Sequence, residues 1–170
     1  MDGGKTAMTD VLTHVLTGFV LGTTLSFRFN WLDRRFITIV MLGAILPDVT
    51  KIGLVVPSET VQEALGLPFY WFVLHTPFGT VITASLTALL VGDDYRNRVF
   101  GLLLVGAGSH FVLDSLLINP SRFSYVLFWP VATELAPLPM LILSSDQWPA
   151  AVALCAAVAA WFSRWYIDRA

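Results

Sequence analysis

The chain has 170 residues, of which 56% are hydrophobic and only 13% are charged. Ordinary soluble domains carry about 25% charged residues, so this composition argues against a soluble globule and predicts a membrane protein. The formal net charge of −2 and the lack of a basic run argue against nucleic-acid binding, and the single cysteine, Cys155, excludes a disulfide framework.

Five stretches are each close to the twenty apolar residues that a helix needs to span a bilayer. They cover residues 11–27, 36–56, 69–92, 99–118 and 148–167. A further segment, 131–145, is divided by Pro137 and Pro139, and a short crossing, a re-entrant segment and a surface helix all remain open for it. We therefore expect an all-α fold, a polytopic transmembrane helix bundle with about five membrane helices, in which residues 1–170 form a single domain.

Two prolines, Pro47 and Pro77, interrupt the second and third stretches. Proline lacks an N–H group, and such breaks persist in membranes where the freed carbonyl oxygens face a polar or protein-lined cavity. Between these two stretches, residues 57–68 are predicted to form a short amphipathic connector.

The distribution of basic residues predicts an orientation. With five crossings, one side collects seven arginines and the other side only three basic residues. The seven are Arg28, Arg34, Arg35, Arg96, Arg98, Arg164 and Arg169, against Lys5, Lys51 and Arg122. The positive-inside rule then places the N-terminus outside a cell membrane. A crossing at 131–145 would balance the count at five to five but leave the first four helices oriented in the same way.

Three histidines and two aspartates lie inside the predicted spans, where polar side chains are costly and often functional. With about 1.5 Å of rise per residue and a core of about 30 Å, they fall in one layer roughly 5–12 Å below the outer surface. These residues are His14, Asp48, His75, His110 and Asp114. Imidazole and carboxylate groups are typical ligands of a divalent metal, with Zn²⁺ the first candidate. The sequence thus predicts a metal site near the extracytoplasmic face.

Small residues share helix faces with these polar groups. Gly18 and Gly22 continue the face of His14, Ala44 shares the face of Asp48, and Gly106 shares that of His110. Small residues at four-residue spacing let helix backbones approach closely in lipid. The polar residues are therefore expected to face other helices.

Taken singly, each residue has a simpler interpretation. A lone membrane histidine more often makes a hydrogen bond between helices, and an aspartate after a proline break can cap a helix. The spacing of His110 and Asp114 places them on one helix face, but any amphipathic helix can contain such a pair. Only the agreement of residue type and depth favours metal binding.

Five motifs in order along the chain carry a family resemblance. They are Thr13-His14 followed by Gly18 and Gly22, the run Gly43-Ala44-Ile45-Leu46-Pro47-Asp48, Leu74-His75-Thr76, the run Gly108-Ser109-His110-Phe111-Val112-Leu113-Asp114, and Leu127-Phe128-Trp129-Pro130. With them the chain resembles the YdjM-like family, membrane-bound proteins predicted from pattern to be metal-dependent hydrolases. The family is remotely similar in its ligand pattern to zinc-dependent phospholipase C.

The resemblance implies metal roles for Asp48, His75, His110 and Asp114, with His14 completing a second site that shares Asp114. The chain departs from the family pattern at two positions. Thr50 stands where members often have a second acid, and Tyr70 stands where they often have a histidine.

The favoured function is a membrane-bound, metal-dependent hydrolase that acts on an ester or phosphoester of a lipid-like substrate through a metal-activated water. Asp48 is either a metal ligand or the acceptor of the water proton. The alternative is a non-catalytic membrane protein with a structural metal or His/Asp cluster. A proton or ion pathway ranks last, because the inner halves of the third and fourth stretches contain little polar beyond Thr87.

Overall fold

The computed structural model describes residues 3–118, 129–131, 141–143 and 146–169. The described residues form six α-helices, two 3₁₀ helices and one pair of two-residue strands. In chain order the elements are α1 (Gly3–Arg28), α2 (Arg34–Ile45), η1 (Leu46–Leu54), α3 (Ser58–Leu65), η2 (Trp71–His75), α4 (Pro77–Leu89), α5 (Asp93–Leu116), β1 (Leu117–Ile118), β2 (Ile142–Leu143) and α6 (Trp148–Ile167). The prediction of a helical bundle is confirmed.

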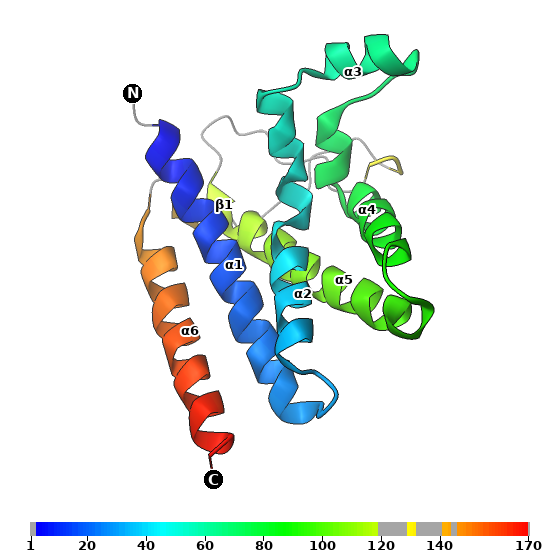
Figure 1. Ribbon diagram of the computed structural model, residues 1–170. Helices are drawn as coiled ribbons and strands as arrows, with labels where there is room; N and C mark the ends of the chain where they lie inside the picture. Colours follow the sequence, from blue (N-terminus) through cyan, green and yellow to red (C-terminus); the bar gives the residue numbers. More distant parts are fainter. Residues whose placement is uncertain (1–2, 119–128, 132–140, 144–145, 170) are drawn as a thin grey trace.

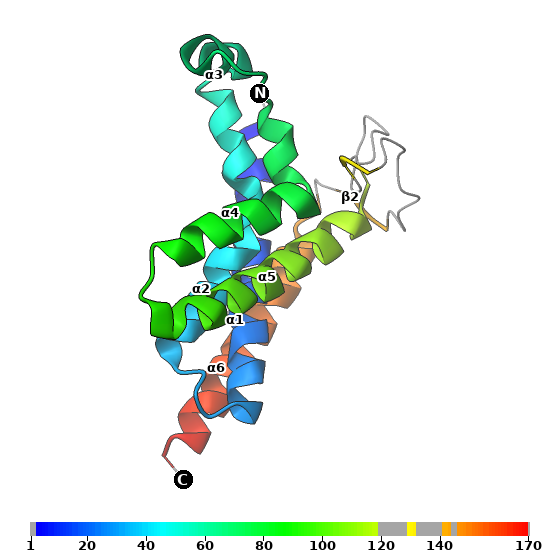
Figure 2. The ribbon, with the colours of Figure 1, turned by 90° about the vertical axis from the view of Figure 1, so that its right-hand side faces the viewer.

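The helices run in two principal directions. α1 lies between α2 and α6, and these three helices extend along the long axis of the molecule (Figure 1). α4 and α5 lie side by side and cross α2 obliquely, as the second view shows (Figure 2). The depths estimated from the sequence use the full rise per residue for every span, which holds only for helices that share one direction, and α5 does not share that of α2.

Two glycines allow the close crossing of α2 and α5. A Cβ atom at Gly106 would overlap the carbonyl oxygen of Val40, and one at Gly43 would overlap that of Leu103. No other residue type leaves room for this approach between backbones. The contact holds the second half of α5, which carries His110 and Asp114, against the end of α2.

The two prolines change the backbone as expected. α2 ends at Ile45, and the chain continues through Pro47 as the 3₁₀ helix η1. Before Pro77 the chain forms η2 and then starts α4, where the hydroxyl oxygen of Thr76 accepts a hydrogen bond of 3.1 Å from the N–H of Gly79. Proline at the first position of a helix loses no intrahelical hydrogen bond, so Pro77 begins a helix whereas Pro47 ends one.

Among the residues that the structure describes, three segments have the length and composition of a membrane span: Arg34–Leu54, Asp93–Leu116 and Trp148–Ile167. They correspond to the second, fourth and fifth predicted stretches. The third stretch is divided at Thr76, and α4 has 13 residues, about 20 Å of helix, which is short of a bilayer core. The first lies within α1, which has 26 residues. The total of five crossings therefore stays a prediction.

The structure describes all of the predicted connector 57–68 but only part of the segment 131–145. The connector 57–68 contains the helix α3, none of whose residues is buried. Of the segment 131–145, the structure describes Val131 and 141–143, and there Ile142 and Leu143 pair in parallel with Leu117 and Ile118. The described part after Val131 is thus a short strand beside the end of α5. Leu127 and Phe128 of the last family motif lie outside the described residues.

Candidate metal centre

All five predicted ligands come together where α1, α5, η1 and η2 meet. Each histidine comes from a different element, α1 for His14, η2 for His75 and α5 for His110. The three rings and Asp114 are at most 9% exposed. Buried ionisable groups without compensation are strongly unfavourable, so this cluster requires a physical explanation.

The carboxylate of Asp114 is the centre of the cluster. Its Oδ1 lies 3.2 Å from Nε2 of His14, and its Oδ2 lies 2.9 Å from Nε2 of His75 and 3.2 Å from Nε2 of His110. The rings of His14 and His110 stack with centroids 3.9 Å apart. Three imidazole nitrogens therefore point at one carboxylate.

Backbone carbonyl oxygens orient two of these rings. Nδ1 of His110 lies 2.7 Å from the carbonyl oxygen of Ala44, and Nδ1 of His75 lies 3.1 Å from that of Pro47. A carbonyl oxygen only accepts, so we infer that Nδ1 carries the proton in both rings. In a neutral ring protonated at Nδ1, Nε2 is a hydrogen-bond acceptor. It then faces the carboxylate of Asp114, which is also an acceptor, with no hydrogen atom between the two. Such an arrangement is favourable when a cation or an extra proton lies between the groups.

Pro47 also bears on the carbonyl oxygen of Ala44, which Nδ1 of His110 contacts. In the 3₁₀ pattern that starts at Leu46, the donor for the carbonyl of Ala44 would be the N–H of residue 47, and proline has none. The sequence predicts the break at Pro47 but not the contact between His110 and the carbonyl oxygen of Ala44. A hydrogen bond from the far ring nitrogen of a ligand histidine to a carbonyl oxygen is typical of metal sites, because it fixes the orientation of the ring.

The potential ligands form two overlapping groups, and in each the donor atoms lie within 4.8 Å of one another. One group is His14, His110 and Asp114; the other is Asp48, His75 and His110. Two donors bound to one tetrahedral zinc ion are roughly 3.4 Å apart, so these separations are compatible with metal binding. The resemblance implied that Asp114 is shared between two sites. In the structure His110 belongs to both groups, although Asp114 contacts all three rings.

The chain matches a known protein family over most of its length. The pattern of the YdjM inner membrane protein family matches residues 8–169. The chain belongs to the YdjM inner membrane protein family. Buried His/Asp groups that could hold a metal ion are therefore found in a membrane protein of this family. No curated protein and no solved structure matches the chain.

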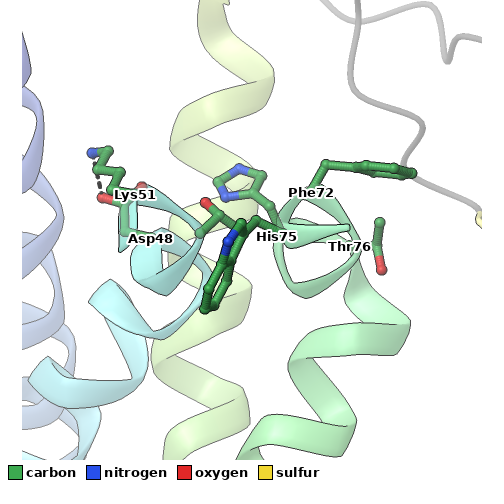
Figure 3. A pocket seen from close by; sticks show the side chains of 7 residues that line it. Asp48, Lys51, Phe72, His75 and Thr76 are labelled. Carbon is green, nitrogen blue, oxygen red and sulfur yellow. Dashed lines mark hydrogen bonds and ion pairs between the residues drawn. The ribbon is translucent and has the colours of Figure 1, made fainter. Parts of the chain in front are cut away.

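A cavity of about 300 Å³ adjoins the cluster in this YdjM-family chain (Figure 3). Asp48 and His75 form its polar wall, and Trp71 and Phe72 contribute apolar surface. Nζ of Lys51 lies 2.7 Å from Oδ2 of Asp48, so a cation also borders this space. A small molecule in the cavity would therefore meet the second ligand group.

Lys51 was not predicted as a site residue, because in the sequence it is one of the few basic residues and bears first on orientation. Its position three residues after Asp48, on the same helix, was the signal that could have identified it.

The structure also describes Thr50 and Tyr70, the two residues at which the chain departs from the family pattern. Thr50 lines the cavity, and its hydroxyl donates to the carbonyl oxygen of Pro47 at 3.3 Å. Tyr70 caps η2 and is more than half exposed.

Proposed function

We propose that this chain is a membrane-bound, metal-dependent hydrolase. The observation that carries the proposal is the arrangement of acceptors around Asp114. With Nδ1 of His75 and His110 committed to carbonyl oxygens, their Nε2 lone pairs and the carboxylate would repel one another without a metal ion or an extra proton between them. A bound divalent ion removes that repulsion and neutralises the buried carboxylate.

The donor set favours zinc among the divalent ions. It consists of imidazole nitrogens and carboxylate oxygens from His14, Asp48, His75, His110 and Asp114. Imidazole-rich sites suit Zn²⁺, whereas Mg²⁺ and Ca²⁺ prefer oxygen ligands. When bound, such an ion acts as a Lewis acid and lowers the pKa of a water molecule toward about 7.

The chain's own contribution to the reaction is assigned to Asp48. Its carboxylate borders the cavity and belongs to the second ligand group, so it can hold the proton that a water molecule loses there. The ammonium group of Lys51 keeps this carboxylate in place through their ion pair. His14, His110 and Asp114 do not line the cavity and would hold a metal ion beside it.

The substrate class follows from the surroundings of the cavity. The cavity is bordered by Trp71 and Phe72 in a chain whose helices associate with the lipid bilayer. We therefore propose an ester or phosphoester of a lipid-like molecule as the substrate. The arginine distribution favours an outside N-terminus, which would open the site toward the extracytoplasmic side.

Two measurements test the proposal. Elemental analysis of the detergent-purified chain is expected to find bound zinc in stoichiometric amount. His110→Ala, which removes the residue common to both ligand groups, is expected to abolish hydrolysis of lipid esters or phosphodiesters while circular dichroism keeps its helical signal. A chain that never binds a divalent metal would refute the proposal.

The rival function is structural. The burial of His110 and Asp114 inside the helix contacts is also what a metal that only joins helices would need. In that case metal removal would unfold the chain, and no ester or phosphoester would be turned over by the metal-loaded protein. The hydrolase instead turns over a substrate of this class and loses this activity in Asp48→Asn.

A further inference from the structure

A second cavity, of about 270 Å³, lies between α1, α2 and α6. It is at the end of the bundle where α1 and α6 finish and α2 begins, whereas His14 lies in the other half of α1 (Figure 1). None of the five metal-site residues lines it. It is therefore separate from the candidate metal centre.

The lining of this cavity changes from charged to apolar along the helices. Arg34 and Asp168 are at the ends of α2 and α6, and Met41 lies seven residues further along α2, about 10 Å deeper. Phe19 of α1 also lines the deeper part. A molecule that fits must be polar at one end and apolar at the other, as a membrane lipid is.

Two guanidinium groups and one carboxylate supply the charge at the outer end. Arg164 is held in place by Ser26, whose Oγ accepts from its Nη1 at 2.6 Å, and by Asp168, whose Oδ1 is 3.1 Å from its Nε. Nη2 of Arg34 lies 3.9 Å from Oδ2 of Asp168, and the Arg34 side chain is 88% exposed. One positive charge is thus left over, on a guanidinium group that a ligand can reach.

A buried hydroxyl lies in the wall between the charged and apolar ends. Thr23 is 1% exposed and lines the cavity, and Oγ1 of Thr23 has no hydrogen-bond partner among the described residues. Buried hydroxyl groups nearly always have a partner, and each exception calls for an explanation. Because this oxygen is itself buried, the Thr23 side chain would rotate to meet a ligand oxygen in the cavity, which would then provide the partner.

We propose that this cavity binds an anionic membrane lipid, with the phosphate group between Arg34 and Arg164 and the start of an acyl chain along Phe19 and Met41. Guanidinium groups bind phosphate oxygens through charge-assisted hydrogen bonds. Trp161 and Trp165 line the same cavity, and tryptophan is enriched at the level of lipid headgroups. Arginines near a membrane surface attract anionic lipids.

Native mass spectrometry of the full chain in detergent tests the proposal with two lipids of equal acyl chains. Phosphatidylglycerol is expected to be retained in preference to phosphatidylcholine. Arg34→Gln should weaken retention of phosphatidylglycerol about fivefold, the factor expected for one arginine at an anionic surface. Arg35→Gln is the matched control, because Arg35 is the exposed neighbour that does not line the cavity, and it should leave retention unchanged.

Two further measurements distinguish binding of a whole lipid from binding of a free phosphate ion. Thr23→Val keeps the shape of the side chain but removes the hydroxyl, and it should also weaken retention of phosphatidylglycerol. Excess inorganic phosphate should not displace the lipid, because the phosphate ion lacks the acyl contacts. Equal retention of both lipids, equal loss in Arg34→Gln and Arg35→Gln, no effect of Thr23→Val, or displacement by phosphate would each overturn the proposal. None of these readouts depends on hydrolysis or on bound metal.

Discussion

The carboxylate of Asp114 lies 2.9 Å from Nε2 of His75, a residue 39 positions earlier in the chain. On its other side, the His75 ring faces the carbonyl oxygen of Pro47 through Nδ1. One imidazole therefore joins the break in the second helical segment to the buried face of α5. This contact places Asp48, one residue after Pro47, beside the cluster that surrounds Asp114.

The first prediction concerns Asp114 itself. Asp114→Asn keeps the size of the side chain but removes the charge that three imidazoles face. We expect metal affinity to fall by more than about 100-fold, because even outer-shell changes cost 10–100-fold. Elemental analysis after desalting measures this. Asp94→Asn, at an exposed position in the same helix, is the control and should retain the metal. Equal metal content in both variants would contradict a role for Asp114 as ligand.

The second prediction separates catalysis from metal binding. Asp48→Asn should lower turnover by about 10²–10⁴, the usual contribution of a general base. The group of His14, His110 and Asp114 should still hold one ion. Turnover and metal content are measured on the same preparation, with Glu59→Gln on the exposed helix α3 as the control. Unchanged turnover in Asp48→Asn would remove Asp48 from the mechanism.

Much of the site could be predicted from residue type and depth. Histidine and aspartate are rare inside membrane spans, and His14, His110 and Asp114 were recognised for that reason. Their convergence holds in the structure even though the depth estimates assumed upright helices. α5 is oblique, but the crossing at Gly43 and Gly106 still carries its second half to the end of α2.

The other features of the site depend on contacts between distant residues, which the spacing of residues in the sequence does not predict. The partner of the His110 ring is a backbone carbonyl 66 residues away, beside the break at Pro47. Likewise, Pro77 predicts a break in the third stretch, but hydropathy does not reveal that the part before the break is a 3₁₀ helix and the part after it only 13 residues long. Crossing angles arise from packing between distant segments, so a single sequence does not reveal them.

The third prediction tests that crossing. Gly106→Ala places a Cβ against the carbonyl oxygen of Val40 and should destabilise the chain by about 1–3 kcal/mol, the usual range for overpacking. Metal content should fall with it, since His110 moves away from Ala44. Thermal unfolding in detergent gives the stability. Gly108→Ala in the same helix has nothing within 4 Å of the new Cβ and should be neutral or more stable by up to about 1 kcal/mol. Equal stability of the two variants would mean that α2 and α5 do not pack this closely.

The last prediction concerns Pro47, which lies three residues after Ala44 at the start of η1. Pro47→Ala restores an N–H group, which competes with Nδ1 of His110 for that oxygen. The His110 ring then loses its orienting contact, and metal affinity is expected to fall by about 10–100-fold, the usual effect of removing such a partner. The helix itself should gain stability, so affinity and thermal stability move in opposite directions.

Titration against a competing chelator measures the affinity, and Pro77→Ala is the matched control. Pro77 stands at the start of α4, where a restored N–H group has no intrahelical partner to displace, so this variant should keep the affinity of the parent chain. If both proline variants bind metal equally well, the orientation of His110 comes from its packing against His14 and Phe111 and not from the break at Pro47.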